Sequence, residues 1–400
     1  MCAKKILFTA SIPLHIRAFH LPYLEWLQKQ GYEIHVATNG FEDLPFVDKY
    51  WNIPFSRTPF SLDNITAYTE LKQIIENENF ALIHCHTPVT SVITRLASIK
   101  ARQRDTKLLY TAHGFHFFKG ASVLNWMVFY PVEIFLSKYT DAIICINQED
   151  FNRIQKKGSQ NCNYHIIPGI GVNKSRFNNA ALEKKSLLRS KYNFKADEFL
   201  LIYAAEFITR KNHEFIIKTV KNKTKVFRNT RILFAGKGEL EESLKDMVKK
   251  AGLQNYIQFL GFRKDIHSLY KIADVGISSS TQEGLAINLV EEMMCGLPII
   301  ASKVRGHNEV VNHNINGFLF EQNNEFQFCK YVLTLRMKPN LSKEFSTNAI
   351  IKAQKFEIEN SLKKMVKIYR TYLTGNTASL PDNLQINGNL TGKNTKYDKI

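Results

Sequence analysis

The feature that most constrains the fold of this chain is a regular alternation of short apolar runs with longer amphipathic stretches. Such an alternation predicts strands spaced by helices, and therefore right-handed βαβ units in a parallel, doubly wound sheet. In the first half the expected strands begin at Ile6, Glu33, Ala81, Lys107 and Ala142. A second series begins at Phe199, Arg231, Ile257, Val275 and Pro298. The sequence therefore predicts an α/β protein with two Rossmann-like domains and a cleft between them.

The boundary between the two series falls in residues 164–172, which are rich in proline and glycine and typical of a hinge. We expect a first domain over residues 1–168 and a second over residues 169–355. Residues 356–374 are expected to form a final helix that packs back on the first domain, and the polar residues 375–400 are predicted to be disordered. Ligands of open α/β sheets bind at the carboxyl ends of the strands, so each domain is expected to hold one substrate.

Composition excludes several classes of protein. The 400 residues are 44% hydrophobic and 22% charged, as in soluble globular proteins, and the apolar stretches are far shorter than a membrane-spanning helix. The net charge of +18 favours a phosphate-bearing partner. Six cysteines without a C-x-x-C pair are typical of buried thiols in a reducing compartment. The apolar N-terminal run mimics a signal peptide, but Pro13 interrupts it, and a buried first strand in a cytoplasmic protein explains it better.

The sharpest motif is the segment 281–300, which follows an expected strand. Gly284 allows a ligand to approach the backbone closely. The backbone N–H groups of Leu285, Ala286 and Ile287 are expected in the first turn of the next helix, where they have no intrahelical acceptor. A helix N-terminus of this kind binds phosphate or sugar oxygens.

Two glutamates accompany this expected helix. Glu283 lies just before its first turn, and Glu291 lies eight residues on, two turns deeper and nearly on the same face. At 1.5 Å per residue, the two carboxylates could bind hydroxyls about 10 Å apart. The hexose and the ribose of a nucleoside diphosphate sugar carry such hydroxyls. The alternative is an amphipathic helix with solvated glutamates, but the strand–turn–helix context favours a ligand site.

These motifs, together with others in the first half, resemble family 4 of the retaining glycosyltransferases, which have the GT-B fold. The matching segments are Glu283-Gly-Leu with Glu291, Gly296-Leu-Pro-Ile-Ile-Ala-Ser, His113-Gly-Phe-His-Phe-Phe, Tyr139-Thr-Asp-Ala-Ile-Ile-Cys-Ile-Asn and Ile167-Pro-Gly-Ile-Gly-Val-Asn. The stretch at His113, with Asn125-Trp and Tyr130-Pro-Val-Glu, is similar to the capsule and exopolysaccharide branch. The resemblance implies retention of configuration and independence from metal, with Glu291 on the ribose and Glu283 on the sugar hydroxyls.

The resemblance also assigns catalytic roles. Arg210 and Lys211 stand where the family binds the diphosphate, and fixed cations there would stabilise the departing pyrophosphate. Many relatives have Arg at the position of Glu206, so either Arg210 replaces that cation or Lys211 acts alone. An exposed basic loop is the alternative. His113, at a strand end, is implied to touch the donor sugar or the leaving phosphate.

Further site residues are expected on both substrate sides. On the donor side they are Gly236, in a Gly-x-Gly turn, and Phe262 and Arg263, in a loop that resembles the one holding the nucleotide base. His15 and Arg17, in the loop after the first strand, could face the acceptor. His116 either contacts the acceptor or packs in the core.

No metal and no cofactor are expected. The sequence has no Asp-x-Asp motif of the metal-dependent transferases. His84 and His86 share one face of a strand, but no further ligand pair has zinc spacing. The absence of a P-loop and of a dinucleotide-binding fingerprint argues against an ATPase and a dehydrogenase.

A basic and aromatic region suggests a membrane surface. The basic residues are Arg95, Lys100, Arg102, Arg104 and Lys107. They precede the apolar, aromatic segment 119–138, in which Trp126 and Tyr130 are the expected interfacial anchors. The alternative is a buried core helix. Nucleic acid is not an expected partner, because no nucleic-acid-binding module is present.

The sequence thus predicts a glycosyltransferase that moves a hexose or N-acetylhexosamine from a UDP-sugar to a lipid-linked oligosaccharide on undecaprenyl diphosphate. It would act in capsule or exopolysaccharide synthesis, in the cytoplasm and peripherally at the inner face of a bacterial plasma membrane. One alternative is a UDP-sugar epimerase of the same fold, which needs no acceptor. Another is a non-catalytic basic protein that binds lipid or nucleic acid.

Overall fold

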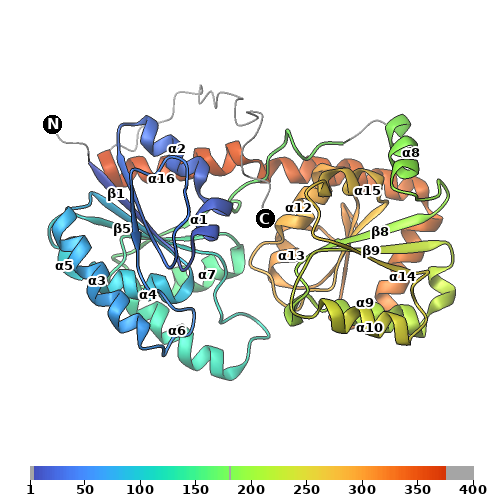
Figure 1. Cartoon of the computed structure of the whole chain (residues 1–400), viewed down its shortest axis with the longest axis horizontal. Coiled ribbons are helices and arrows are strands. Elements are labelled where there is room, and N and C mark those ends of the chain that lie inside the picture. Colours follow the sequence, from blue (N-terminus) through green and yellow to red (C-terminus); the bar gives the residue numbers. More distant parts are fainter. Residues whose placement is uncertain (1–3, 180–181, 375–400) are drawn as a thin grey trace. The chain divides into compact units, whose positions relative to one another are not determined.

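The computed structural model describes residues 4–179 and 182–374, which form two compact units (Figure 1). Unit 1 comprises Met1–Ile170 and Ile358–Ile400, and unit 2 comprises Gly171–Glu357. The first division lies beside Gly169 and Gly171, which have positive φ angles of 74° and 87° that favour glycine. The polar tail predicted over residues 375–400 lies outside the described residues.

In the described part of unit 1, seven parallel strands form one sheet in the order β3-β2-β1-β4-β5-β6-β7. This is the Rossmann order with one more strand at an edge, and the order reverses between β1 and β4. Buried apolar side chains of the central strands form the core on both faces of the sheet. The strands are β1 (Lys5–Thr9), β2 (Glu33–Thr38), β3 (Lys49–Asn52), β4 (Leu82–His86), β5 (Lys107–Ala112), β6 (Ala142–Cys145) and β7 (Asn163–Ile166).

Helices cover both faces of this sheet, with α3, α4 and α6 on one face and α2 and α16 on the other (Figure 1). Local capping fixes where some of them begin. Ser122 accepts a hydrogen bond from the backbone N–H of Asn125 at the start of α6, and Asn147 accepts one from Asp150 at the start of α7. The helices are α1 (Pro13–Phe19), α2 (Leu21–Lys29), α3 (Asp63–Glu78), α4 (Pro88–Ala97), α5 (Ile99–Arg102), α6 (Val123–Ser137), α7 (Gln148–Lys157) and α16 (Ile358–Thr374).

Unit 2 repeats the plan. Its described residues form six parallel strands in the order β10-β9-β8-β11-β12-β13, and this order reverses between β8 and β11. The strands are β8 (Phe199–Ala204), β9 (Thr230–Ala235), β10 (Ile257–Gly261), β11 (Val275–Ser278), β12 (Ile299–Ser302) and β13 (Gly317–Phe320). The helices are α8 (Leu182–Lys191), α9 (His213–Asn222), α10 (Glu241–Lys250), α11 (Ile266–Ile272), α12 (Ile287–Met294), α13 (Arg305–Val310), α14 (Glu325–Met337) and α15 (Pro339–Ala353), with short 3₁₀ turns η1 (Thr209–Lys211), η2 (Thr224–Phe227) and η3 (Gln354–Phe356).

The last helix, α16, packs on unit 1 although it follows unit 2 in the chain. Tyr369 is fully buried there, its ring is stacked on that of Trp26, and its hydroxyl lies 2.8 Å from Nδ1 of His84. The hydroxyl of Tyr372 accepts a hydrogen bond of 2.9 Å from the side-chain amide of Asn163. Strand β4 and strand β7 are thus tied to the end of the chain.

The structure corrects the expected hinge. Residues 164–166 of that segment belong to the edge strand β7, which Ile167 and Pro168 follow. The prediction was wrong there because the strand is only half-buried and therefore lacks the apolar run on which strand prediction relies.

No helix within residues 4–179 or 182–374 has both the length and the hydropathy that crossing a lipid bilayer requires. The five cysteines among these residues are free thiols, and all are buried.

Candidate functional site

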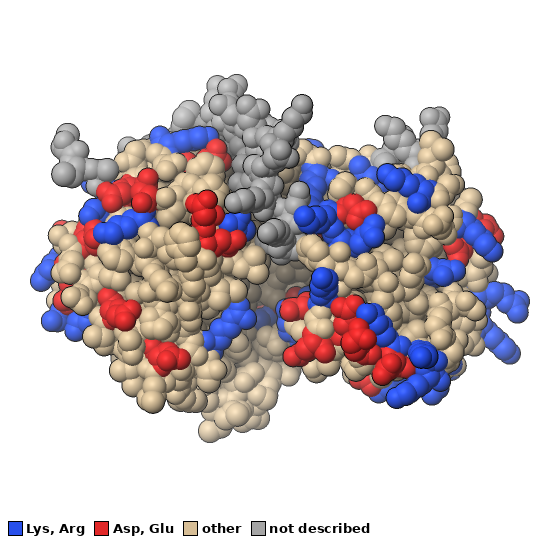
Figure 2. Space-filling view, in the orientation of Figure 1, with Lys and Arg blue, Asp and Glu red and all other residues tan. Residues whose placement is uncertain are grey.

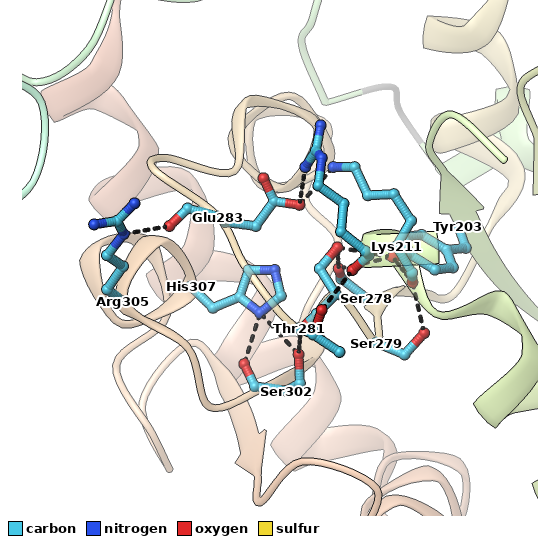
Figure 3. Close-up of polar contacts among 11 residues, drawn as sticks. Tyr203, Lys211, Ser278, Ser279, Thr281, Glu283, Ser302, Arg305 and His307 are labelled. Carbon is cyan, nitrogen blue, oxygen red and sulfur yellow. Dashed lines mark hydrogen bonds and ion pairs between the residues drawn. The ribbon is translucent and has the colours of Figure 1, made fainter. Parts of the chain in front are cut away.

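Two loops meet at the switch point of unit 2, the place between β8 and β11 where the strand order reverses. Both loops carry residues predicted to bind the donor. The loop after β8 contains η1 with Arg210 and Lys211, and the loop after β11 leads to Glu283 (Figure 3). The backbone N–H of Thr281 donates to the carbonyl oxygen of Arg210 at 2.8 Å, and the Ser279 hydroxyl donates to that of Asn212 at 2.8 Å. These bonds fix the two loops against each other, so the charged side chains on them have defined positions.

Glu283 forms an ion pair with the two basic residues of the other loop. Its Oε1 atom lies 2.5 Å from Nζ of Lys211 and 3.5 Å from a guanidinium nitrogen of Arg210. Glu283 is 7% exposed, and burial alone would raise the pKa of its carboxyl; Lys211, His307 and Arg210 outweigh burial and hold that pKa below its usual value. Lys211 and Arg210, which are predicted to bind the diphosphate, therefore both lie at one carboxylate oxygen of Glu283, which is predicted to bind the sugar.

Glu291 lies on α12, and its environment differs from that of Glu283. Burial raises the pKa of the Glu291 carboxyl to about 7, although Arg176 and a hydrogen bond from the Tyr270 hydroxyl, 3.3 Å away, act in the opposite direction. The two glutamates therefore differ in protonation state at neutral pH. Glu283 is ionised and lies in an ion pair, whereas Glu291 is close to half-protonated.

The expected stagger of Glu283 and Glu291 along one helix is wrong. Helix α12 begins only at Ile287, so Glu283 lies four residues before it, in the loop, and the helical rise does not apply to the pair. The non-helical backbone of Ala286, with φ −86° and ψ 85°, separates the loop from the helix. The ion pair with Lys211, rather than helical periodicity, positions Glu283.

The expected position of the free amides changes for the same reason. Of the three residues predicted in the first turn, only Ile287 belongs to the helix. Leu285 and Ala286 precede it, and both are buried, at 8% and 1% exposure. Gly284 lies in the same loop, between Glu283 and these two residues. The free N–H groups of the helix therefore begin at Ile287.

Sequence reasoning missed two residues of this site, Arg305 and His307, which belong to α13 after β12 (Figure 3). The Nε atom of Arg305 donates to the backbone carbonyl of Glu283 at 3.1 Å. Gly306 packs so closely on Glu283 that an added Cβ would lie 2.6 Å from the Cβ of that residue. The only sequence signal for these two residues was Gly306, a glycine shortly after the end of the expected strand.

His307 offers a free acceptor beside Glu283. Burial lowers the pKa of His307 to about 4, so its ring is neutral at pH 7. Its Nδ1 lies 2.6 Å from the carbonyl oxygen of Ser302 and must carry the proton, because a carbonyl only accepts. Nε2 is then an acceptor that is buried and has no hydrogen-bond partner among the described residues.

The other expected donor residues lie at the same edge of the sheet, but no described contact joins them to Glu283. Gly236 follows β9, and an added Cβ would lie 2.0 Å from the carbonyl oxygen of Ala205, so the packing of two loops already requires glycine. Phe262 follows β10 and is 39% exposed. Arg263 forms a bidentate ion pair with Asp265, with hydrogen bonds of 2.8 and 2.7 Å.

In unit 1, the structure brings two expected residues together at its switch point. Nε2 of His15, on α1, lies 3.3 Å from Nε2 of His113, which follows β5. Arg17 instead forms an ion pair of 2.6 Å with Glu42. His116 stacks on Phe129 of α6, with ring centroids 4.6 Å apart.

The expected anchors of α6 face the core. Trp126 and Tyr130 both pack against the fully buried ring of Phe117. The large apolar side chains that α6 exposes are instead Val123, Leu124, Met127, Val132 and Phe135. Figure 2 shows a stretch without charged side chains at the lower edge of unit 1, where Figure 1 places α6.

The expected basic patch is also smaller than the sequence suggested. Arg95 is fully buried and is bound by Glu133 at 2.8 and 3.1 Å. Arg102 is bound by both oxygens of Asp141. A basic residue in a charged stretch of sequence is therefore not always a surface charge.

Comparison with known proteins gives two family matches. The family described as "Glycosyltransferase Family 4" matches residues 23–174, and "Glycosyl transferases group 1" matches residues 184–352. A Bacillus subtilis protein named "Putative glycosyltransferase EpsD" is 40% identical over 377 residues, which cover 94% of this chain and 98% of that protein. An Escherichia coli protein named "UDP-Gal:alpha-D-GlcNAc-diphosphoundecaprenol alpha-1,3-galactosyltransferase" is 26% identical over 266 residues, covering 66% of this chain and 68% of that protein.

Solved structures share the fold. HepE from Anabaena, in complex with UDP and glucose, has a TM-score of 0.73 at 21% identity. The match covers 92% of this chain and 100% of the HepE chain. Sucrose-phosphate synthase from Thermosynechococcus elongatus has a TM-score of 0.76 at 17% identity, covering 93% and 100%. Given these matches and a relative that is 40% identical along nearly its whole length, the chain belongs to glycosyltransferase family 4, is a glycosyltransferase and has the GT-B fold.

Proposed function

We propose that this glycosyltransferase transfers a hexose or N-acetylhexosamine from a UDP-sugar to a lipid-linked oligosaccharide, with retention of configuration, in capsule or exopolysaccharide synthesis. The observation that carries the donor half of this proposal is the set of Lys211, Arg210 and Glu283 at the switch point of unit 2. The HepE complexes with UDP and UDP-glucose, and the UDP-Gal transferase named above, support UDP as the nucleotide.

Each donor residue has a proposed role that the family resemblance implies and that its chemistry permits. Glu291 accepts hydrogen bonds from the ribose hydroxyls, and Glu283 accepts them from the sugar. Lys211 and Arg210 bind the diphosphate without a metal ion. Gly236, Phe262 and Arg263 line the nucleotide side, and the amides from Ile287 onward serve the phosphate or sugar oxygens.

The reaction exchanges one bond at the anomeric carbon for another. The bond from C1 of the sugar to the UDP oxygen breaks, and a bond from C1 to the acceptor oxygen forms on the same face. The proton of the acceptor hydroxyl passes to the leaving phosphate oxygen, so no protein nucleophile is required. The largest contribution of the protein is the fixed positive charge of Lys211 and Arg210, which stabilises the departing diphosphate.

Unit 1 is the proposed acceptor half. The E. coli relative is named for an undecaprenol-diphosphate acceptor, which supports a lipid-linked acceptor here. His113, His15 and His116 lie on this unit, and the exposed apolar side chains of α6 offer a face that could rest on the cytoplasmic surface of the membrane. The relatives named as transferases argue against the epimerase alternative.

Donor binding is tested by thermal shift and calorimetry of the full chain with UDP-, GDP- and ADP-sugars, because a ligand that binds only the folded state raises the melting temperature. Glu291→Ala is expected to weaken UDP-sugar affinity about ten- to a hundredfold, since hydrogen bonds to a charged group contribute about 1.5–3 kcal/mol. Glu242→Ala, at a glutamate whose side chain is 86% exposed in the same unit, is the matched control. Unchanged affinity in Glu291→Ala would contradict the ribose assignment.

Transfer itself is tested by supplying undecaprenyl-diphosphate sugars as acceptors in vesicles and following the lipid product. Release of UDP with an elongated lipid product supports the proposal. Conversion of UDP-N-acetylglucosamine to a 2-epimer without acceptor would establish the epimerase instead. Binding of lipid or RNA that ignores every nucleotide sugar would identify a non-catalytic binding protein.

The raised pKa of Glu291 predicts a pH dependence of donor binding. The ionised carboxylate is the better acceptor for ribose hydroxyls, so the protonated fraction must release its proton on binding. With a pKa of about 7, the dissociation constant is expected to be about tenfold larger at pH 6 than at pH 8 by linkage. Calorimetry across this range checks it, with Glu291→Gln as the control that should flatten the profile. An equally steep profile in Glu291→Gln would assign the titration to another group.

A further inference from the structure

Unit 1 contains a cluster of four histidines, of which only His113 has an expected role toward the donor. His15, His20, His86 and His113 each offer one ring nitrogen, and these atoms all lie within 4.8 Å of one another. The four residues come from separate places: α1, the junction of α1 and α2, the end of β4, and the loop after β5. All of them belong to unit 1, and they gather where its strand order reverses, which is where ligands bind in sheets of this kind.

Two members of the cluster have unmet hydrogen-bonding groups. His20 is 1% exposed and His86 is fully buried, and neither ring nitrogen of either residue has a hydrogen-bond partner among the described residues. A neutral imidazole carries one donor and one acceptor, and buried polar groups are nearly always satisfied. The stacking of the two rings, with centroids 3.7 Å apart, satisfies neither nitrogen. The ring nitrogens of both side chains are therefore available to bind a ligand.

One distance within the cluster matches the geometry of a bound metal ion. Nε2 of His15 and Nε2 of His113 are 3.3 Å apart. Two ligands on a tetrahedral zinc ion with bonds of 2.0–2.1 Å are also about 3.3 Å apart. The neighbouring His84 does not compete for the ion, because both of its ring nitrogens are bound, by Tyr369 and by Thr111, each at 2.8 Å.

We propose that His15, His20, His86 and His113 bind one divalent transition-metal ion of the zinc class. Imidazole nitrogen is a preferred ligand of Zn²⁺, Co²⁺ and Ni²⁺. His15 and His113 are partly exposed whereas His20 and His86 are buried, so the ion would be reached from one side. All four histidines belong to unit 1, and the test of the site does not depend on the identity of the transferred sugar.

The experiment uses the full chain purified without a polyhistidine tag, stripped with a chelator and titrated with Zn²⁺ by calorimetry. One ion per chain is expected, and Co²⁺ in its place should give the intense visible absorption of a low-coordinate nitrogen site. His20→Gln and His86→Gln are expected to bind Zn²⁺ at least about 100-fold more weakly, since loss of an outer-shell partner alone costs 10–100-fold. His35→Gln is the matched control, because His35 is also fully buried in unit 1 but its nitrogens contact Glu33 and Trp51.

His15→Ala guards against misfolding, because His15 lies at the partly exposed side of the cluster. Zn²⁺ should raise the melting temperature of the wild-type chain and of His35→Gln, and should do so much less in His15→Ala. The proposal is overturned if the wild-type chain takes up no stoichiometric ion. It is equally overturned if His15→Ala and His86→Gln bind as tightly as the wild type, or if His35→Gln loses the ion to the same extent.

Discussion

Replacing Lys211 by alanine is expected to lower the turnover number about 100- to 1,000-fold, the loss typical of removing one preorganised charge-stabilising group. The ammonium group is held 2.5 Å from Oε1 of Glu283, and its side chain is only 12% exposed, so water cannot readily replace it. The charge of the departing diphosphate grows toward the transition state, and a fixed cation acts most strongly there. Donor affinity is therefore expected to fall much less than turnover.

Steady-state kinetics with calorimetric donor affinity separates the two effects. Lys218→Ala is the matched control, because Lys218 lies in the same unit with a side chain that is 61% exposed and pairs only locally with Glu214. Arg210→Ala should have a smaller effect than Lys211→Ala, since Arg210 is 45% exposed and lies 3.5 Å from the carboxylate. Equal losses of turnover and of affinity in Lys211→Ala would reject a role specific to the transition state.

The sequence predicts the central strands of both sheets because they are continuous apolar runs. Strand β4 shows both the strength and the limit of that rule, since all its residues are buried although His84 and His86 belong to it. The edge strands β3 and β7 escape prediction because they are short and half-exposed. An edge strand is specified by its neighbour's backbone more than by its own side chains.

At the candidate site, residue identity was easier to predict than geometry. Glu283, Glu291 and Lys211 stand out in the sequence by spacing and resemblance. The contact between Glu283 and Lys211 joins residues 72 positions apart and depends on the strand order, which no local pattern contains. His307 and the four-histidine cluster are missed for the same reason, because their members are brought together only by the fold.

Arg95 illustrates the opposite error, in which local sequence suggests the wrong environment. It stands among basic residues, yet its guanidinium is fully buried. It donates to both oxygens of Glu133 at 2.8 and 3.1 Å and to the backbone and hydroxyl oxygens of Ser91, each at 3.1 Å. The ring of Tyr110 lies 4.4 Å away. The ion pair of Arg95 and Glu133 joins α4 to α6. It therefore holds α6, the helix whose outer face is apolar, on the unit.

Glu133→Ala is therefore expected to destabilise unit 1 by about 3–5 kcal/mol, because it leaves a buried guanidinium without its counter-ion. The measurement is the melting transition of unit 1 in calorimetry of the full chain, compared with Glu25→Ala. Glu25 forms an exposed ion pair with Lys29 in the same unit, and its loss is expected to cost less than about 1 kcal/mol. Replacing both partners, Arg95→Met with Glu133→Leu, should recover much of the loss, since no buried charge remains. If Glu133→Ala melts like Glu25→Ala, water must reach Arg95, and the pair would not be what fixes α6 to the unit.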